Sequence, residues 1–297
     1  MELCLGTVQL GMRYGIQNNG RPDRKEIDAI LSAALENGIC WFDTAPVYGE
    51  AESILGRYIS EHPERAEHMR IISKLAANAF FGIPRKDWSR AVLEHIQTTL
   101  ERLHKQCIAV YMFHNAAHIF DADAVKALET ARQEGLAERI GVSIYTPEEA
   151  MRALAYPQIS VIQIPYNVFD RRLDRCGFFA EAKKKNVRIY ARSTLLQGLL
   201  TMTPEQLPVH MKFAAPYVEK FHSICIRGSI SPLRAAVGFV KSHQDIHYLV
   251  FGSDNERQLH EYLSIAAETL SPKVVNELNN EFDVVEERLV NPSLWNG

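Results

Sequence analysis

The run IAVYMF, residues 108–113, carries most of the information about the fold. It is apolar throughout, whereas a strand with one solvated face would alternate, and this is typical of a parallel strand covered on both faces. The run HYLVF at 247–251 has the same character. On both sides of these two runs, short β-rich segments alternate with longer amphipathic segments along the chain. The pattern predicts repeated βα units.

The repeat predicts eight strands. We expect them at Leu3–Gln9, Cys40–Thr44, Arg70–Lys74, Ile108–His114, Arg139–Ser143, Val161–Pro165, Val187–Arg192 and His247–Gly252. Helices are predicted between them wherever an N-cap residue and a closing glycine frame an amphipathic run. Examples are residues 23–38, with Asp23 and Gly38, and 121–135, ending at Gly135, as well as 146–155 and 231–243, which open with Thr146-Pro147 and Ser231-Pro232.

Eight such units predict a (β/α)8 barrel, with residues 1–297 forming one domain. An open doubly wound sheet is the alternative, and the lack of a G-x-G-x-x-G motif after a strand disfavours it. The length beyond a typical barrel falls mainly in an insertion at about 194–231 and a C-terminal tail at about 269–297. In such a barrel the chemistry lies at the carboxyl ends of the strands.

Composition excludes several classes of partner. The formal net charge is −3, so the chain lacks the field that would hold nucleic acid or an anionic membrane. The N-terminus MELCLGTVQLG has no cationic n-region, and no apolar run reaches about 18 residues, so we expect a cytoplasmic protein without a membrane span. The 5 cysteines are widely spread, without metal-ligand spacing, and are expected to be reduced thiols packed in the interior.

Ionisable residues stand at the predicted strand ends. They are Asp43, Lys74 and His114, and Tyr48 lies in the loop after the second strand. Each has a plainer explanation alone, as a turn residue, a core histidine or a packed aromatic. Lys74 is the hardest to explain that way, because a buried ammonium needs a partner. On adjacent strands facing one barrel mouth, these four residues predict a catalytic site.

Such a set supports proton transfer to a carbonyl oxygen. A free tyrosine has a pKa of about 10, and a nearby ammonium favours the phenolate and lowers that pKa. Asp43 would keep Lys74 charged and oriented, while His114 would donate a hydrogen bond to the substrate carbonyl. No metal cluster or nucleophile is indicated, so carbonyl reduction would need a bound hydride donor.

The same residues lie in segments that resemble the aldo-keto reductases. These segments, in family order, are FDTAPVYGEAESILG (42–56), ISKLA (72–76), FHNA (113–116), IGVS (140–143), QIPYN (163–167) and FGSDNERQLHE (251–261). The resemblance implies a (β/α)8 barrel that binds NAD(P)H and reduces an aldehyde or ketone. It also implies that Tyr48 is the general acid, that Lys74 and Asp43 tune the pKa of Tyr48, and that His114 orients the carbonyl. Arg192, where most members have a tyrosine, resembles a bacterial subgroup found near sugar and polysaccharide biosynthesis genes.

The resemblance also implies cofactor contacts. Ser143 and Gln163 match the positions that hold the nicotinamide carboxamide, but Ile144 replaces the usual Asn. Arg192 replaces the tyrosine that stacks on the nicotinamide, and its planar guanidinium could stack there instead. The remaining implied contacts are Gly6, Thr7, Ser193, Leu195, Gln197, Gly198, Gly252, Ser253, Asn255, Arg257, Gln258 and Glu261.

The adenosine end departs from the family pattern. Many NADPH-using members hold the 2′-phosphate with a Lys and an Arg, where this chain has Gly252 and Gln258. Tyr262 replaces the Asn that often contacts adenine. Arg257 could reach the phosphate, or it could be a solvated charge on a helix. Family habit makes NADPH the first expectation, and NADH stays open.

The expected partner is a small-molecule carbonyl substrate, and the sequence makes no prediction of oligomeric state. Aromatic and related side chains that could line its pocket, or simply pack, are Trp41, Phe80, Phe81, Trp88, His118 and Trp295, together with the polar stretch 14–21. Two alternatives remain. One is a nucleotide-binding regulatory or sensor protein on the same barrel with little turnover. The other, a phosphate-binding isomerase, leaves the four residues at the strand ends unexplained.

Overall fold

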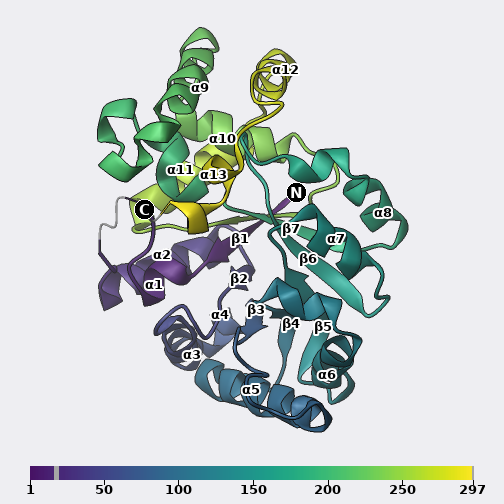
Figure 1. The fold of residues 1–297 in the computed structure, drawn as a ribbon. Helices are drawn as coiled ribbons and strands as arrows, with labels where there is room; N and C mark the ends of the chain where they lie inside the picture. Colours follow the sequence, from purple (N-terminus) through teal and green to yellow (C-terminus); the bar gives the residue numbers. More distant parts are fainter. Residues whose placement is uncertain (17–19, 296–297) are drawn as a thin grey trace.

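Eight parallel strands close into a barrel in chain order, β1 to β8, and so confirm the predicted architecture (Figure 1). The computed structural model describes residues 1–16 and 20–295; part of the stretch 14–21 and the last two residues of the tail thus lie outside the described residues. The strands are β1 (Glu2–Gly6), β2 (Trp41–Asp43), β3 (Arg70–Leu75), β4 (Ile108–Phe113), β5 (Ala137–Ser143), β6 (Ile159–Pro165), β7 (Arg188–Arg192) and β8 (Tyr248–Phe251).

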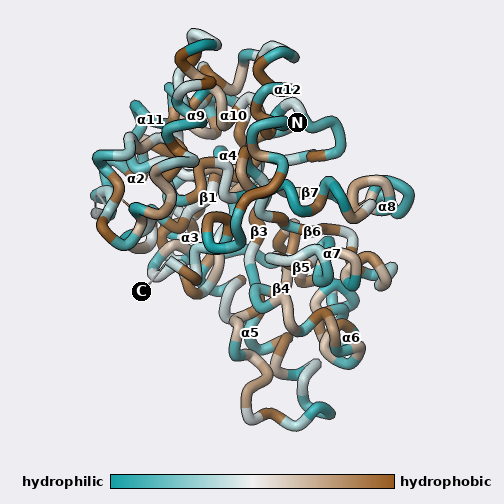
Figure 2. The backbone as a smooth tube through the Cα atoms, turned by 45° about the horizontal axis from the view of Figure 1, so that its top comes forward, coloured by the Kyte–Doolittle hydropathy of each residue, from teal (hydrophilic) through white to brown (hydrophobic). Residues whose placement is uncertain are grey.

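Helices connect consecutive strands on the outside of the barrel. The crossover helices are α2 (Arg24–Glu36), α3 (Ala51–Glu61), α5 (Trp88–Leu103), α6 (Ala122–Gln133), α7 (Pro147–Leu154), α8 (Phe178–Lys184) and α10 (Pro232–Lys241), and α11 (Glu256–Ala267) follows β8. Along α2 and α5 hydrophilic and hydrophobic residues alternate, as an amphipathic helix on a core requires (Figure 2). Shorter or additional helices are α1 (Val8–Gly11), α4 (Pro63–Ala66), α9 (Ala215–Arg227), α12 (Pro272–Glu281) and α13 (Glu287–Val290).

The predicted helix starts are confirmed by their hydrogen bonds. The Asp23 carboxylate accepts from the Glu26 amide at 2.9 Å. Thr146 and Glu149 form a reciprocal capping box at the start of α7, and the Ser231 hydroxyl accepts from the Arg234 amide at 3.2 Å. Each cap satisfies amides that have no partner inside the helix, and for that reason these four-residue patterns can be recognised in the sequence.

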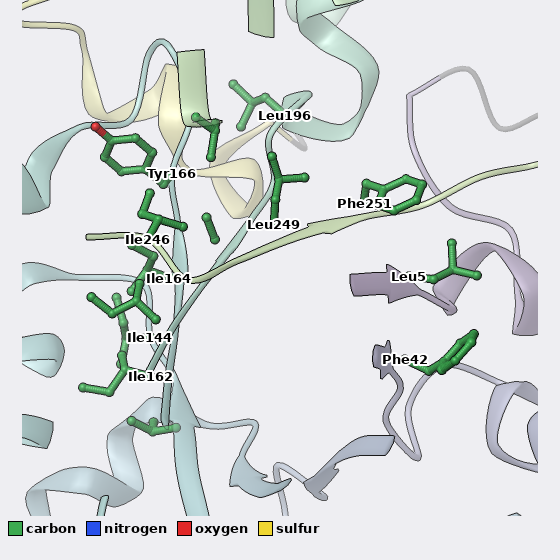
Figure 3. Packing of buried hydrophobic residues seen from close by; sticks show 14 of the residues in the cluster. Leu5, Phe42, Ile144, Ile162, Ile164, Tyr166, Leu196, Ile246, Leu249 and Phe251 are labelled. Carbon is green, nitrogen blue, oxygen red and sulfur yellow. The ribbon is translucent and has the colours of Figure 1, made fainter. Parts of the chain in front are cut away.

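The core has two parts, one on each side of the sheet. Inside the barrel lies a small cluster of Cys4, Ile72, Ala109, Val110, Met112, Val161, Tyr190, Tyr248 and Val250, with Trp41 packed against it. Alternate side chains of the same strands point outward and pack under the helices; Leu5, Phe42, Ile162 and Leu249 are examples (Figure 3). This two-sided burial is the reason that the strands are apolar throughout.

The first strand ends earlier than predicted. It stops at Gly6, and the segment Val8–Gly11 forms the short helix α1 instead of continuing the strand to Gln9. The carbonyl oxygen of Thr7 accepts from the amides of Leu10 and Gly11, while the Thr7 amide and hydroxyl both donate to the Asp43 carbonyl oxygen. Thr7 therefore turns the chain and joins the ends of β1 and β2. Elsewhere the boundaries shift by a few residues, as at β5, which begins at Ala137.

The predicted insertion and tail pack against each other beside the barrel. The insertion contains α9, and the tail contains α12, which lies next to α9 (Figure 1). From α12 the chain returns across the barrel mouth, where residues 290–293 line the central cavity. The two additions thus form one wall of that cavity.

All 5 cysteines are unpaired. Cys4 and Cys225 are buried as expected, whereas Cys40, Cys107 and Cys176 are only partly buried, so the expectation of interior thiols holds for two of them. Among the described residues, no helix combines the length and apolar character needed to cross a membrane.

Candidate active site

A cavity of about 1190 Å³ opens at the carboxyl ends of the strands. It is larger than most pockets for drug-sized ligands, which range from about 300 to 1,000 Å³. Most of the residues expected at the site line it, namely Gly6, Thr7, Asp43, Tyr48, His114, Ser143, Arg192, Ser193, Leu195, Gln197, Gly198, Gly252, Gln258 and Glu261. Five expected residues are not part of its lining: Lys74, Gln163, Ser253, Asn255 and Arg257.

A buried ion pair forms the floor of the cavity. Lys74 Nζ donates to Asp43 Oδ1 and Oδ2 at 2.9 Å each and to the Thr44 carbonyl oxygen at 2.9 Å. The lysine is only 1% exposed. Burial acts to lower the pKa of Lys74, but its interactions with Asp43, and to a lesser extent with Tyr48, outweigh burial, and the pKa is raised above its ordinary value. Lys74 therefore stays charged beneath the cavity without lining it.

Tyr48 lies above this pair. Lys74 Nζ is 4.9 Å from the centre of the Tyr48 ring. Burial raises the pKa of Tyr48 above its usual value, and the positive charge of Lys74 works against that rise. The sequence predicted only the lowering effect of Lys74. In the structure that effect is present, but burial is the larger influence, so the phenol is protonated at neutral pH.

The loop that carries Tyr48 is held by two glycines. Gly49 has a φ of 60°, and a Cβ there would overlap the Gly11 carbonyl oxygen. In the opposite direction, a Cβ at Gly11 would overlap the Tyr48 carbonyl oxygen. Sequence reasoning missed this contact. The only signal for it was the presence of glycine at both positions, which by itself does not identify a partner.

His114 faces the same part of the cavity as a neutral imidazole. Its ring centre is 6.0 Å from that of Tyr48, and the two rings are nearly perpendicular at 83°. Burial and the charge of Lys74 lower the pKa of His114 to about 4. Among the described residues none pairs with its buried Nδ1. A neutral histidine carries one N–H, which can donate to an oxygen in the cavity.

Gln163 is bound to the floor of the site. Its Nε2 donates to Asp43 Oδ1 at 2.8 Å, and within the described parts of the chain its buried Oε1 has no partner. The sequence predicted Gln163 as a cofactor contact, and in the structure its amide nitrogen donates to the Asp43 carboxylate. The remaining free acceptor is Oε1.

Arg192 is fixed by several contacts at the end of β7. Its Nε donates to Ser143 Oγ at 3.3 Å and its Nη2 to the Ile144 carbonyl oxygen at 3.0 Å. The guanidinium also lies over the Tyr145 ring, 4.4 Å from its centre. Tyr145 lines the cavity and was not singled out in the sequence, because an aromatic residue in a loop carries no positional signal.

The segment after Arg192 has unusual backbone geometry. Ser193, Leu196 and Gln197 have positive φ angles of 61°, 48° and 57°. For residues other than glycine such angles are uncommon and often occur at functional sites. Thr194, in the same segment, has a buried hydroxyl that none of the described residues pairs with. This strained segment lines the cavity as expected from the resemblance.

The far end of the cavity lies between β8 and α11. Because Gly252 has no side chain, the Gln9 side chain can lie against the Gly252 backbone. A Cβ atom at residue 252 would overlap the Gln9 side chain. The Ser253 hydroxyl donates to the Asn255 carbonyl oxygen at 2.7 Å, and Asn255 caps α11. Ser253, Asn255 and Arg257 are thus not among the lining residues, whereas Asp254, which sequence reasoning did not select, is one.

The aromatic residues proposed for a substrate pocket lie elsewhere. Phe80 stacks on Trp88 with ring centres 4.5 Å apart, and Trp41 packs inside the barrel against Tyr190 and Tyr248. Trp295 is buried, with Nε1 donating to the Arg288 carbonyl oxygen at 2.8 Å. In the described parts of the chain, none of these residues belongs to the cavity lining, and neither does Phe81 or His118. The lining does include Tyr14 and the tail residues 290–293.

The arrangement can place a proton donor and a hydrogen-bond donor on one oxygen atom. Tyr48 and His114 share the cavity, and the charged pair below Tyr48 can stabilise a phenolate after proton transfer.

The crystal structure of PA4992 from Pseudomonas aeruginosa has the same fold, with a TM-score of 0.65 at 22% identity and coverage of 89% of both chains. Aldo-keto reductase YhdN of Bacillus subtilis (strain 168) is 29% identical over 210 residues, which are 69% of this chain and 62% of that protein. Uncharacterized oxidoreductase YrpG of the same organism is 24% identical over 313 residues, 95% of this chain and 92% of that protein. The family described as "Aldo/keto reductase family" matches residues 2–281, and this chain therefore belongs to the aldo/keto reductase family.

Proposed function

We propose that this protein is an oxidoreductase that uses NAD(P)H to reduce an aldehyde or ketone to an alcohol. The observation that carries the proposal is the buried Lys74–Asp43 pair beneath Tyr48, with a neutral His114 facing the same cavity. Family membership supports the reaction class.

The cavity fits a bound dinucleotide in size and in its free polar groups. Thr194 lines the cavity, and its Oγ1 is buried without a partner among the described residues, so a ligand group at hydrogen-bond distance would satisfy it. Ser143 and Arg192 would hold the nicotinamide end, the segment 193–198 the middle, and the β8–α11 end the adenosine. When bound, reduced nicotinamide supplies the hydride.

The residues of the chain have distinct roles in the proposed reaction. His114 donates a hydrogen bond to the carbonyl oxygen and polarises it. Tyr48, protonated because burial raises its pKa, transfers its proton to that oxygen as negative charge develops. Lys74, kept charged by Asp43, stabilises the resulting phenolate.

The substrate class we propose is a small aldehyde, ketone or sugar-like carbonyl compound. The rim of the cavity carries polar groups from Tyr14, Asn291 and Ser293, which can bind hydroxyl groups. L-glyceraldehyde 3-phosphate reductase of Escherichia coli (strain K12), a relative 28% identical over 186 residues, is named for a small hydroxylated aldehyde. This likeness covers 58% of this chain and 54% of that protein.

The test combines a carbonyl panel with one conservative variant. Oxidation of NADH or NADPH is followed by absorbance with the purified protein and small carbonyl compounds. Tyr48→Phe should lower kcat by about 10²- to 10⁴-fold, the usual contribution of a general acid, while the dinucleotide Kd changes little. Wild-type turnover by Tyr48→Phe contradicts the assigned acid. Tight dinucleotide binding without any turnover across the panel would favour the sensor alternative.

A further inference from the structure

Arg192 brings a positive charge to the catalytic end of the cavity. Among the described residues that line the cavity, it is the one lysine or arginine. Burial raises the pKa of Tyr48 and lowers that of His114, and the charge of Arg192 acts to lower both. The field of Arg192 therefore reaches the two side chains that would hold the carbonyl oxygen of a substrate.

The hydrogen bonds that fix Arg192 go to neutral groups. Its Nε donates to Ser143 Oγ at 3.3 Å, and its Nη1 donates to Ser193 Oγ at 3.2 Å. Its Nη2 donates to the Ile144 carbonyl oxygen at 3.0 Å, and the guanidinium lies over the uncharged ring of Tyr145. These contacts orient the guanidinium but do not neutralise its charge.

The carboxylates that line the described part of the cavity do not neutralise it either. Asp43 lies at the catalytic end, where both of its oxygens accept from Lys74 Nζ, so its charge balances that of the lysine. The other two, Asp254 and Glu261, line the β8–α11 end. The catalytic end is thus left with a positive charge on Arg192 that the lining does not balance.

The proposed reduction creates a further positive charge at this end. A hydride passes from the reduced nicotinamide ring to the carbonyl carbon, the Tyr48 proton passes to the carbonyl oxygen, and the ring is left with one positive charge. Because the hydride must reach the carbon whose oxygen is held by Tyr48 and His114, the ring has to lie at the end of the cavity that Arg192 lines. Like charges within about 6 Å of each other in a partly buried site repel strongly.

We propose that Arg192 makes this site selective for the redox state of the nicotinamide, so that the reduced dinucleotide binds more tightly than the oxidised one. The inference rests on the proposed function. The reduced ring is neutral and meets no repulsion, whereas the oxidised ring binds against the guanidinium charge. The oxidised dinucleotide therefore dissociates faster than the reduced one, because differences in affinity between closely related complexes lie mostly in the dissociation rate.

The direct test is binding, measured without turnover. The Kd values of NADH, NAD⁺, NADPH and NADP⁺ for the full chain are obtained by isothermal titration calorimetry at pH 7. Within each pair we expect the reduced form to bind at least about tenfold tighter than the oxidised form. For a two-electron couple, a tenfold ratio places the reduction potential of the bound dinucleotide about 30 mV above that of the free one.

Charge variants of Arg192 test the residue itself. Arg192→Gln removes the charge and should lower the ratio of the two Kd values by about tenfold, whereas Arg192→Lys keeps the charge and should retain most of the ratio. Arg188→Gln is the matched control, because Arg188 begins the same strand at its opposite end and is outside the cavity lining. That variant should leave the ratio unchanged.

ADP-ribose separates a charge effect on the ring from a contact with the rest of the dinucleotide. It carries the same pyrophosphate and adenosine but lacks nicotinamide, so its Kd should be the same for wild type and Arg192→Gln. If Arg192→Gln weakens all four dinucleotides and ADP-ribose equally, Arg192 binds the pyrophosphate and the inference is wrong. Thermal unfolding establishes that each variant is folded.

The remaining outcomes distinguish this inference from the proposed function. Equal binding of the reduced and oxidised forms by the wild-type protein overturns the inference and leaves the reductase proposal standing. A preference for the reduced form that persists at full size in folded Arg192→Gln overturns the role of Arg192. If none of the four dinucleotides binds, the proposed function fails, and the inference with it.

Discussion

At the scale of single residues, the site depends on a charge that has no access to water. Lys74 keeps its charge because three oxygen atoms surround its ammonium group, two of them from Asp43. In the proposed reaction the pair acts through its position under Tyr48, because its positive end interacts more strongly with a phenolate than with the neutral phenol.

Removing one partner of this pair should be more harmful than removing both. Lys74→Met is expected to lower the free energy of unfolding by about 3–5 kcal/mol, because it leaves the Asp43 carboxylate buried and unpaired. The double variant Lys74→Met, Asp43→Asn should recover a large part of that loss while remaining inactive. Urea unfolding of the three proteins provides the measurement, and equal stability of Lys74→Met and wild type would contradict the assigned pairing.

The lowered pKa of His114 predicts how stability depends on pH. Burial and the charge of Lys74 hold this pKa at about 4, whereas an unfolded histidine titrates near about 6.5. Between these values the unfolded chain binds more protons, so this contribution to stability is present above about pH 6.5 and is lost as the pH falls toward 4. Urea unfolding at pH 7 and pH 4 should show a loss for the wild-type protein that exceeds the loss for His114→Gln by up to about 3 kcal/mol.

The activity of the enzyme should respond differently. Because His114 is already neutral at pH 7, protonation of its ring should not limit kcat until the pH approaches about 4. The contradicting result is a kcat for the reductive reaction that falls as the pH drops through about 6.5, together with the absence of that fall in His114→Gln. It would show that the histidine is not neutral in the site at lower pH.

At the scale of elements, the loop between β2 and α3 is tightly constrained. It approaches α1 so closely that neither Gly11 nor Gly49 has room for a side chain. This contact places Tyr48 over the ion pair, although the loop contributes little to the hydrophobic core. The position of Tyr48 is therefore set by close backbone packing between Gly11 and Gly49.

Replacing one of these glycines should affect both stability and catalysis. Gly49→Ala introduces strain at a φ of 60° and an overlap with the Gly11 carbonyl oxygen, so Tyr48 must move and kcat should fall by at least about tenfold. Gly135→Ala is the control, because Gly135 has a φ of 71° and open space around it. That variant should cost only about 1 kcal/mol and leave kcat unchanged. Equal kinetic effects in the two variants would contradict a positioning role for Gly49.

At the scale of the whole molecule, the tail is fastened to the barrel by one buried arginine. Arg171, in the loop after β6, donates through Nη2 to the carbonyl oxygens of Asn279 and Phe282 at 2.9 and 2.8 Å. Phe282 in turn packs on Phe169 with ring centres 4.8 Å apart. From this anchor the chain runs on to residues 290–293 in the wall of the cavity.

Weakening the contacts of Arg171 with the tail should therefore also change substrate binding in the cavity. Arg171→Met is expected to cost about 2–4 kcal/mol, since it removes hydrogen bonds made by a charged group and leaves carbonyl oxygens unpaired. It should also speed proteolytic cleavage in the tail and raise the KM for the carbonyl substrate. Arg175→Met is the matched control, because Arg175 pairs with Asp283 at the surface and should contribute less than about 1 kcal/mol. Equal cleavage rates in both variants would argue against the anchor.

The barrel and the four residues at its mouth could be predicted because both depend on local patterns. Alternation along a strand places every second residue inside, so Asp43, Lys74 and His114 each follow an inward apolar neighbour, Trp41, Ile72 or Met112, by two positions. Helix caps are local as well, and the predicted ones form as expected.

Partners across the barrel are decided by tertiary structure. Gln163 and Asp43 are far apart in the sequence, and no periodic pattern indicates that the Gln163 amide would bind the Asp43 carboxylate. For the same reason Phe80 and Trp88 stack on each other away from the cavity, while Asp254 faces into it. Periodicity specifies the face on which a side chain lies; what it meets there depends on packing of segments distant in the chain, and in this protein that packing sets the charge at the two ends of the cavity.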